Sequence, residues 1–167
     1  IFRSHVCAGT QPEKHGYFSK YGKTIIGSSN HISEFVTIHS GAGDGVTEIK
    51  NNCIIMAHVH IGHDSLISDN VTISSGAIIG GHTIIMRHAN IGLGAVTHQK
   101  TVIGTCAMLG ANSFVSKKKH IAPGNIYAGV PAKFLKRNDI GLQRAGLTNE
   151  DINADIVTFG KLIGVSL

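Results

Sequence analysis

A branched aliphatic residue recurs at every sixth position from Ile49 onward. The series consists of Ile49, Ile55, Ile61, Ile67, Ile73, Ile79, Ile85, Ile91, Ile103, Leu109, Val115 and Ile121, with Thr97 and Tyr127 at the two positions that depart from it. The fifth position of each six is mostly small and is occupied by Cys53, Val59, Ser65, Val71, Ala77, Thr83, Ala89, Ala95, Thr101, Ala107 and Ser113. An amphipathic helix repeats its apolar face every three to four residues, so this period argues against a helix. It is typical of a parallel β-helix, because each six supplies one short strand and one corner.

The repeat predicts an all-β architecture with a short C-terminal α-helical cap. Three sixes form one coil of about eighteen residues, and successive coils stack at roughly 4.8 Å. We assign residues 1–131 to the β-helix, with a glycine-rich excursion at about 40–48, and residues 132–167 to a helical segment. Within that segment we expect one helix over 132–144 and a second that begins with a capping box at Thr148 and Asp151. The period does not fix the handedness of the coils, and the crossover rule alone favours right-handed ones.

Composition narrows the classes of function. Charged residues make up 15% of the chain and there are 21 glycines, which suits a fold of strands and tight corners. No apolar run is long enough to cross a membrane and no signal peptide is visible, so we predict a cytoplasmic protein without a transmembrane segment. Three cysteines without a CxxC pair predict no disulfide framework.

The net charge of +5 is compatible with an anionic partner. A basic cluster near the end of the repeat consists of Lys117, Lys118, Lys119, Lys133, Lys136 and Arg137. Two interpretations stay open: these residues protect exposed strand edges, or they dock an acidic carrier protein or the phosphates of a cofactor. Nucleic acid is not predicted as a partner, because no aromatic residues are interleaved and no binding motif is present.

Histidines avoid the inward positions one and five of each six. His82 follows His63 by one full coil and one further position, and His98 follows it by one position less than two coils, so all three are expected along one flank of the prism. Asp64 follows His63 and can hold one tautomer of its imidazole, a combination that favours general-base chemistry on a hydroxyl or amine. A zinc site at His58, His60 and His63 is the alternative. We predict no metal, because neither a cysteine nor a second carboxylate joins that set.

Several motifs resemble the UDP-N-acetylglucosamine acyltransferase family of lipid A synthesis. They are Val36-Thr37-Ile38-His39, the glycine-rich excursion, Met56-Ala57-His58-Val59-His60-Ile61-Gly62-His63-Asp64, Ile79-Gly80-Gly81-His82, Ala95-Val96-Thr97-His98-Gln99 and Gly141-Leu142-Gln143-Arg144-Ala145-Gly146. The resemblance extends from about Gln11 to Ile152. It implies a left-handed β-helix that forms a homotrimer with active sites between subunits. It also implies transfer of a 3-hydroxyacyl group from acyl carrier protein to the 3-hydroxyl of UDP-N-acetylglucosamine, without a cofactor.

The resemblance also implies roles for individual residues. His63 corresponds to the catalytic base, Asp64 to its orienting partner, and the Gly81 N–H to the donor that stabilises the oxyanion. The residues expected to contact or position the substrates are Lys14, His60, His82, His98, Gln99, Ala111 and Arg144.

The sequence departs from the family at several points. Pro12-Glu13 stands where the family has an acidic residue just before its lysine, Ala111 replaces a glycine associated with acyl length, and Arg144-Ala145 replaces two adjacent arginines. Gly129-Val130-Pro131-Ala132-Lys133 is more similar to acetyl-CoA-dependent hexapeptide acetyltransferases.

Four functions therefore stay open. The first is the O-acyltransferase, and the second is an acetyl-CoA-dependent N- or O-acetyltransferase on a nucleotide amino sugar. The third is a non-catalytic β-helix used for binding or assembly, and the fourth is a zinc hydratase-like enzyme. The family's early coils are missing, which predicts a fragment or a shortened relative.

Overall fold

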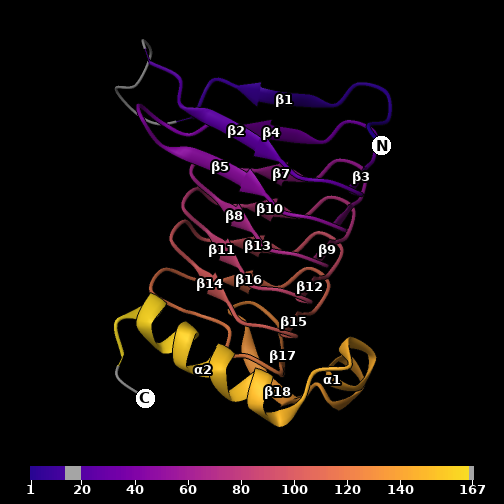
Figure 1. The fold of residues 1–167 in the computed structure, drawn as a ribbon, viewed down its shortest axis with the longest axis vertical. Coiled ribbons are helices and arrows are strands. Elements are labelled where there is room, and N and C mark those ends of the chain that lie inside the picture. The colour runs from indigo at the N-terminus through magenta and orange to yellow at the C-terminus, as the bar shows by residue number, and fades with distance from the viewer. Residues whose placement is uncertain (14–19, 166–167) are drawn as a thin grey trace.

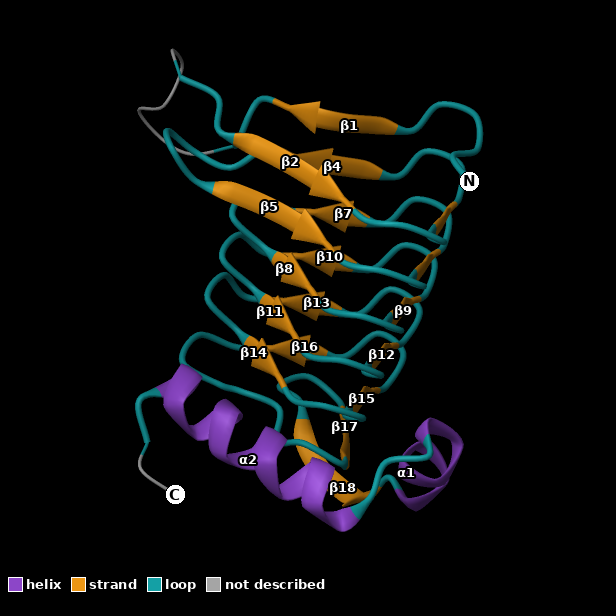
Figure 2. Cartoon of the chain, viewed as in Figure 1, coloured by secondary structure: helices purple, strands orange, loops and turns teal. Residues whose placement is uncertain are grey.

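The computed structural model describes residues 1–13 and 20–165 and shows a stack of three-sided coils (Figure 1). The coils form the predicted left-handed parallel β-helix, and two helices lie at its C-terminal end (Figure 2). Each side of the prism is one sheet whose neighbouring strands come from successive coils.

The three sheets are named here in the order in which the chain visits them. The first sheet contains β1 (Cys7–Thr10), β4 (Thr37–His39), β7 (His60–Ile61), β10 (Ile78–Ile79), β13 (Val96–Thr97) and β16 (Phe114–Val115). The second contains β2 (Lys23–Ile26), β5 (Val46–Ile49), β8 (Leu66–Ile67), β11 (Ile84–Ile85) and β14 (Val102–Ile103). The third contains β3 (His31–Ile32), β6 (Ile54–Ile55), β9 (Thr72–Ile73), β12 (Asn90–Ile91), β15 (Met108–Leu109), β17 (Asn125–Ala128) and β18 (Lys133–Arg137).

The strand register confirms the coil length expected from the period of six. Ile61 pairs with Ile79, which pairs with Thr97, and each partner lies three sixes further along the chain. The aliphatic residues at position one are fully buried and fill the interior, and Thr97 among them is 2% exposed. The small residues at position five are buried as well, so each coil contributes three large and three small side chains to a continuous core.

The corners of the prism hold residues at positive φ. At the first corner, which joins the first sheet to the second, the left-handed residues are Asp64, His82, Lys100 and Lys118, with φ between 56° and 63°. All four stand at position four of their sixes. A side chain in this conformation is uncommon outside glycine, asparagine and aspartate. The corner geometry therefore repeats even where the residue does not favour it.

The glycine-rich excursion is shorter than predicted. Its expected last residues, 46–48, belong to β5, in which Val46 pairs with Lys23 and Ile49 with Ile26. The excursion proper thus ends at Gly45, because the four-residue strand β2 offers backbone partners to the whole of 46–49. The excursion lies between Ile38 and Ile61, so these paired residues are further apart in the sequence than the paired residues Ile61 and Ile79.

The C-terminal cap differs from the helix predicted over 132–144. Residues Lys133–Arg137 instead form β18, which runs antiparallel to β17. The helix α1 (Asp139–Ala145) begins only after Asn138, whose side chain accepts a hydrogen bond from the Gly141 N–H. Residues 133–137 pair with the edge of β17 and so satisfy its backbone hydrogen-bonding groups. This pairing outweighs the helical preference of residues 133–137.

The second helix follows the sequence prediction closely. It is α2 (Asn149–Ile163), and the capping box between Thr148 and Asp151 is present. The helix packs onto the second sheet through Phe159, which is buried with Met86 and Val102. Asp155 accepts a 2.9 Å hydrogen bond from Arg87 Nε, so a charged pair fixes the helix on the prism.

Candidate active site

Polar side chains gather where the first sheet meets the first corner. His60 lies on β7, and His63 and Asp64 form the corner that follows it. Gly81 and His82 occupy the equivalent corner one coil further along. The sequence prediction that His63, His82 and His98 share one flank is confirmed by the register, which pairs Ile61 with Ile79 and Ile79 with Thr97. The ring centroids of His63 and His82 lie 5.0 Å apart.

His63 and Asp64 form a close imidazole–carboxylate pair. His63 Nδ1 lies 2.7 Å from Asp64 Oδ2, and both side chains are largely shielded from solvent, at 9% and 12% exposure. A carboxylate accepts the proton of Nδ1–H, so the lone pair of the neutral ring stands on Nε2. That arrangement makes Nε2 the atom able to accept a proton from a substrate.

The glycine-rich excursion holds the carboxylate of Asp64. The Ala42 N–H donates to both of its oxygens, at 3.2 and 3.3 Å. The Asp64 N–H itself donates to Thr47 Oγ1 at 2.8 Å. A side chain at position 45 has no room, because a Cβ on Gly45 would overlap Asp64 Oδ1. The excursion therefore serves the site by fixing the group that orients His63.

Gly81 lies directly against the His63 ring. A Cβ at this position would stand 2.8 Å from His63 Nε2, so glycine is what leaves the reactive nitrogen its space. No described residue accepts a hydrogen bond from the Gly81 N–H. An N–H that lacks an acceptor and lies beside an imidazole nitrogen is of the kind that can stabilise an oxyanion. His82 lies near the same carboxylate as His63, with its Nε2 atom 3.7 Å from Asp64 Oδ2.

His98 and Gln99 continue the same flank one coil beyond Gly81. His98 Nδ1 lies 3.0 Å from the carbonyl oxygen of Gln99, and a proton on Nδ1 would leave the Nε2 lone pair of His98 available. Gln99 is exposed. The Lys100 N–H donates to the Gly81 carbonyl oxygen at 2.9 Å, which ties this corner to the one above it.

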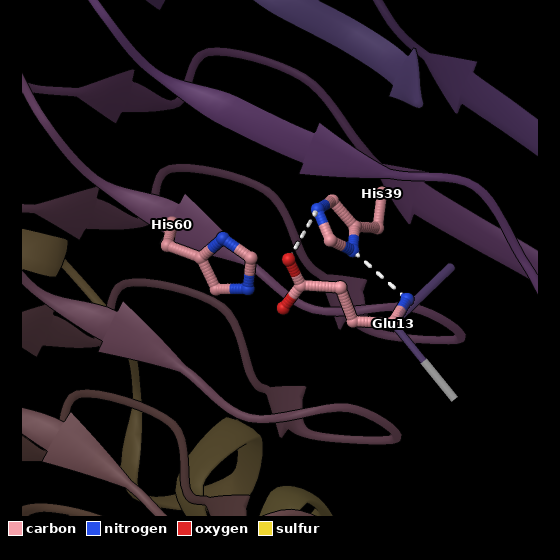
Figure 3. A group of neighbouring side chains, drawn as sticks. All are labelled: Glu13, His39 and His60. Carbon is pink, nitrogen blue, oxygen red and sulfur yellow. Dashed lines mark hydrogen bonds and ion pairs between the residues drawn. The ribbon is translucent and has the colours of Figure 1, made fainter. Parts of the chain in front are cut away.

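A second cluster beside the first was not selected from the sequence. It consists of Glu13, His39 and His60, and it is drawn in Figure 3. The His39 and His60 rings meet edge to face with centroids 4.8 Å apart. His60 was predicted, whereas Glu13 was noted only as a departure from the family. The one available signal was that His39 and His98 share position two of their sixes, which places them in the same column.

Burial lowers the pKa of His39 and of His60 below the ordinary value of 6.5. A proton then binds more tightly to these rings in the unfolded chain than in the folded one. The free energy of unfolding is therefore expected to be highest above about pH 6.5 and to fall as the pH drops below it. Urea denaturation between about pH 8 and about pH 5 measures the effect. The variant His39→Gln should lose less stability over this range, while the exposed-site control His31→Gln should follow the parent chain. Equal slopes for His39→Gln and the parent would contradict the prediction.

Other predicted residues lie elsewhere on the single chain. Ala111 is on the third corner, between β15 and β16. Arg144 is on α1 and lines a cavity of about 360 Å³ with Asn70 and His88, which belong to the second corner. Lys14 falls outside the described residues. The structure thus gathers His60, His63, Asp64, Gly81 and His82 within one chain. It leaves Ala111 on the third corner and Arg144 on α1, beside the second corner.

The residues weighed as a zinc site do not converge. His58 stacks instead on Phe35 with ring centroids 5.0 Å apart, at the third corner. Two other groups of described residues bring three possible ligand atoms within 4.8 Å of one another: Glu13 with His39 and His60, and His63 with Asp64 and His82. Within the described ranges, neither helix is long and apolar enough to cross a bilayer.

Known proteins with similar sequences are transferases built from hexapeptide repeats. Residues 46–81 match the family described as bacterial transferase hexapeptide (six repeats). An acyl-[acyl-carrier-protein]–UDP-N-acetylglucosamine O-acyltransferase from Gloeothece citriformis is 34% identical over 146 residues, which cover 87% of this chain and 52% of that protein. The enzyme of the same name from Paraburkholderia phymatum is 42% identical over 80 residues, covering 47% of this chain and 30% of the relative.

The fold is shared as well. The solved UDP-N-acetylglucosamine acyltransferase of Arabidopsis superposes with a TM-score of 0.84 at 28% identity, covering 96% of this chain and 56% of that one. The chain spans about half or less of the length of the relatives it matches. The chain thus contains hexapeptide repeats and is similar in sequence and in fold to the UDP-N-acetylglucosamine acyltransferases.

Proposed function

We propose that this chain carries an acyltransferase site that moves a 3-hydroxyacyl group from acyl carrier protein to the 3-hydroxyl of UDP-N-acetylglucosamine. One observation carries the proposal: Asp64 lies 2.7 Å from His63 Nδ1 and leaves Nε2 as the basic atom beside the Gly81 N–H, which has no acceptor among the described residues. The names of the related proteins supply the substrates.

His63 acts first as a base and then as an acid. Its Nε2 takes the proton of the sugar hydroxyl while the hydroxyl oxygen attacks the thioester carbonyl carbon. Negative charge develops on the carbonyl oxygen, where the Gly81 N–H stabilises it. When the intermediate collapses, the C–S bond breaks and the imidazolium returns its proton to the departing sulfur. The products are the ester and the free thiol of the carrier, so no cofactor is needed.

The proposal includes a homotrimer with the site between subunits. Ala111 stands on the third corner and Arg144 on α1 beside the second corner, so a single chain does not bring these residues to His63. A neighbouring subunit would bring such residues alongside it. Acyl carrier protein and a UDP-amino sugar are the proposed partners, and cytoplasmic localisation stays a prediction.

Mass spectrometry of the products from mixed donors tests the proposed function. The chain is incubated with UDP-N-acetylglucosamine and a set of acyl-acyl carrier proteins, acyl-CoAs and acetyl-CoA. A mass increase equal to a 3-hydroxyacyl group, dependent on the carrier-protein donor, is expected. Absence of any acylated sugar with every donor would refute the proposal.

An acetyl-CoA-dependent acetyltransferase is the second candidate function. It is favoured by Gly129-Val130-Pro131-Ala132-Lys133, which joins β17 and β18 and is similar to the exit segment of such enzymes. The same mixture decides between the two, because transfer of an acetyl group alone would select this candidate.

Replacing Gly81 with alanine is expected to lower kcat by about tenfold to a hundredfold. The added Cβ would stand 2.8 Å from His63 Nε2, so the ring has to move, and a displacement of about 1 Å can cost 10²-fold. Steady-state kinetics measures the loss. The control is Ser75→Ala, which stands at the same position of its six on the third corner. Full activity of Gly81→Ala would show that the ring does not need this space.

A further inference from the structure

The segment after β1 is bound to the first sheet next to the candidate site. The Ser40 N–H donates to the carbonyl oxygen of Thr10, the last residue of β1, at 2.9 Å. In the segment that follows, the Glu13 N–H donates to His39 Nδ1 at 3.2 Å. Both contacts join residues that are far apart in the sequence. The segment is therefore held against the first sheet, which carries His39 and His60.

Glu13 contacts His39 at both ring nitrogens. Besides the backbone contact at Nδ1, its carboxylate oxygen Oε1 lies 4.0 Å from His39 Nε2. The His39 side chain is 9% exposed, whereas that of Glu13 is 80% exposed, so Glu13 covers the ring from the solvent side. Figure 3 shows its carboxylate between the rings of His39 and His60.

The hydrogen bonds fix where the proton of His39 resides. Nδ1 accepts the Glu13 N–H, so the neutral ring carries its own proton on Nε2, which faces the carboxylate. His60 Nδ1 pairs with the hydroxyl of Thr37 at 2.9 Å. The Glu13 carboxylate thus stands near both rings and faces the Nε2–H of His39 across 4.0 Å.

The same geometry argues against a metal ion at this cluster. A histidine that binds a metal through one nitrogen usually donates its other N–H to an acceptor. The other nitrogen of His39 faces an N–H donor instead. A metal on Nε2 would require this hydrogen bond to break.

We propose that Glu13 is a positioning residue that clamps the segment after β1 to His39 and holds His39 in the Nε2–H tautomer. The next residue in the chain is Lys14, which the resemblance assigns to substrate binding. The clamp therefore fixes the chain immediately before that residue. This consequence for substrate binding rests on the proposed function, whereas the clamp itself does not.

The charge of Glu13 acts on both rings. It raises the pKa of His39 and of His60, against the larger lowering by burial. The groups that act on His39 are Glu13, His60 and His63. Removing the carboxylate charge is therefore expected to lower the pKa of both His39 and His60 further.

Nitrogen-15 NMR of the imidazoles, with amide hydrogen exchange, tests the clamp. The His39 signal is assigned from its loss in His39→Gln. In the parent chain, an unprotonated Nδ1 is expected, with a protected Glu13 amide. Glu13→Gln should keep both features, because the backbone N–H that donates to His39 Nδ1 and the length of the side chain are unchanged, but the His39 titration midpoint should move down. Glu13→Ala should also lose the protection of the amide at position 13. The control Glu150→Gln, on the first turn of α2, should change none of these.

Three results would overturn the proposal. They are a protonated Nδ1 on His39, an unchanged midpoint in Glu13→Gln, and undiminished amide protection in Glu13→Ala. Stoichiometric binding of Zn²⁺ to the parent chain that is lost in Glu13→Gln and in His39→Gln would also overturn it, in favour of a metal site.

Steady-state kinetics gives a second test of the clamp, and this test requires that the proposed function is correct. Glu13→Ala is expected to raise KM for the nucleotide sugar by roughly three- to tenfold, the range of one net hydrogen bond, with kcat little changed. Glu13→Gln should restore most of this loss. If the parent chain transfers no acyl group, the proposed function fails while the NMR result still decides on the clamp. A fall in kcat with KM unchanged would refute the positioning role.

Discussion

Replacing His63 with alanine is expected to lower kcat/KM for acyl transfer by about 10²–10⁴, the usual contribution of a general base. The change removes the Nε2 lone pair that faces Gly81 and leaves the hydroxyl of the acceptor without a group to take its proton. The side chain contributes little to the core, because it stands on a corner outside the inward positions. The variant should therefore fold, with unchanged circular dichroism.

The matched control is His31→Ala, which removes an exposed imidazole from β3 on another sheet. Asp64→Asn is a second informative variant, because an amide in place of the carboxylate permits the wrong tautomer of His63. It should lower kcat while leaving the base in place. Retention of full activity by His63→Ala would remove the base from the mechanism, even if the chain were shown to transfer acyl groups.

Ile55→Ala is expected to reduce the free energy of unfolding by about 2–5 kcal/mol, the usual cost of truncating a buried aliphatic side chain. Ile55 is fully buried in the prism interior, where the coils above and below it leave no freedom to close the resulting cavity. Chemical denaturation measures the loss through the midpoint and slope of the transition.

The neighbouring residue supplies the control for this prediction. Ile54 belongs to the same strand, carries the same side chain and is 45% exposed. Its replacement by alanine should cost less than about 1 kcal/mol. Similar losses for the two variants would mean that the inward and outward positions of the sixes are not the ones described.

The repeat was predictable because it depends on a local rule applied many times. Ile61 and Ile79 face inward for the same reason, so a count of six predicts both their burial and their pairing. The alignment of His63 with His82 followed from the same count. The capping box of α2 was likewise readable, because Thr148 and Asp151 have the spacing that such a box requires.

Predictions were weaker where distant segments meet. Lys133–Arg137 has no strand periodicity of its own and becomes β18 only because β17 offers an edge. Val46 joins β5 because β2 extends far enough to pair with it, which the sequence of the excursion does not indicate. Glu13 reaches His39 from a distant part of the chain, and no period relates these two positions. The carboxylate that orients His63 was found from sequence, whereas the Ala42 N–H that holds it was not.

Because every coil beyond Ile49 has the same number of residues, the length of the prism can change only by whole coils. Removing or duplicating one full coil changes its length by roughly 4.8 Å and restores every backbone pairing at the junction. The spacing between the Asp64 corner and the lysines near position 118 is therefore adjustable only in whole steps. A relative with one coil more or fewer would keep the same chemistry at the corner while presenting it at a different distance from the basic end.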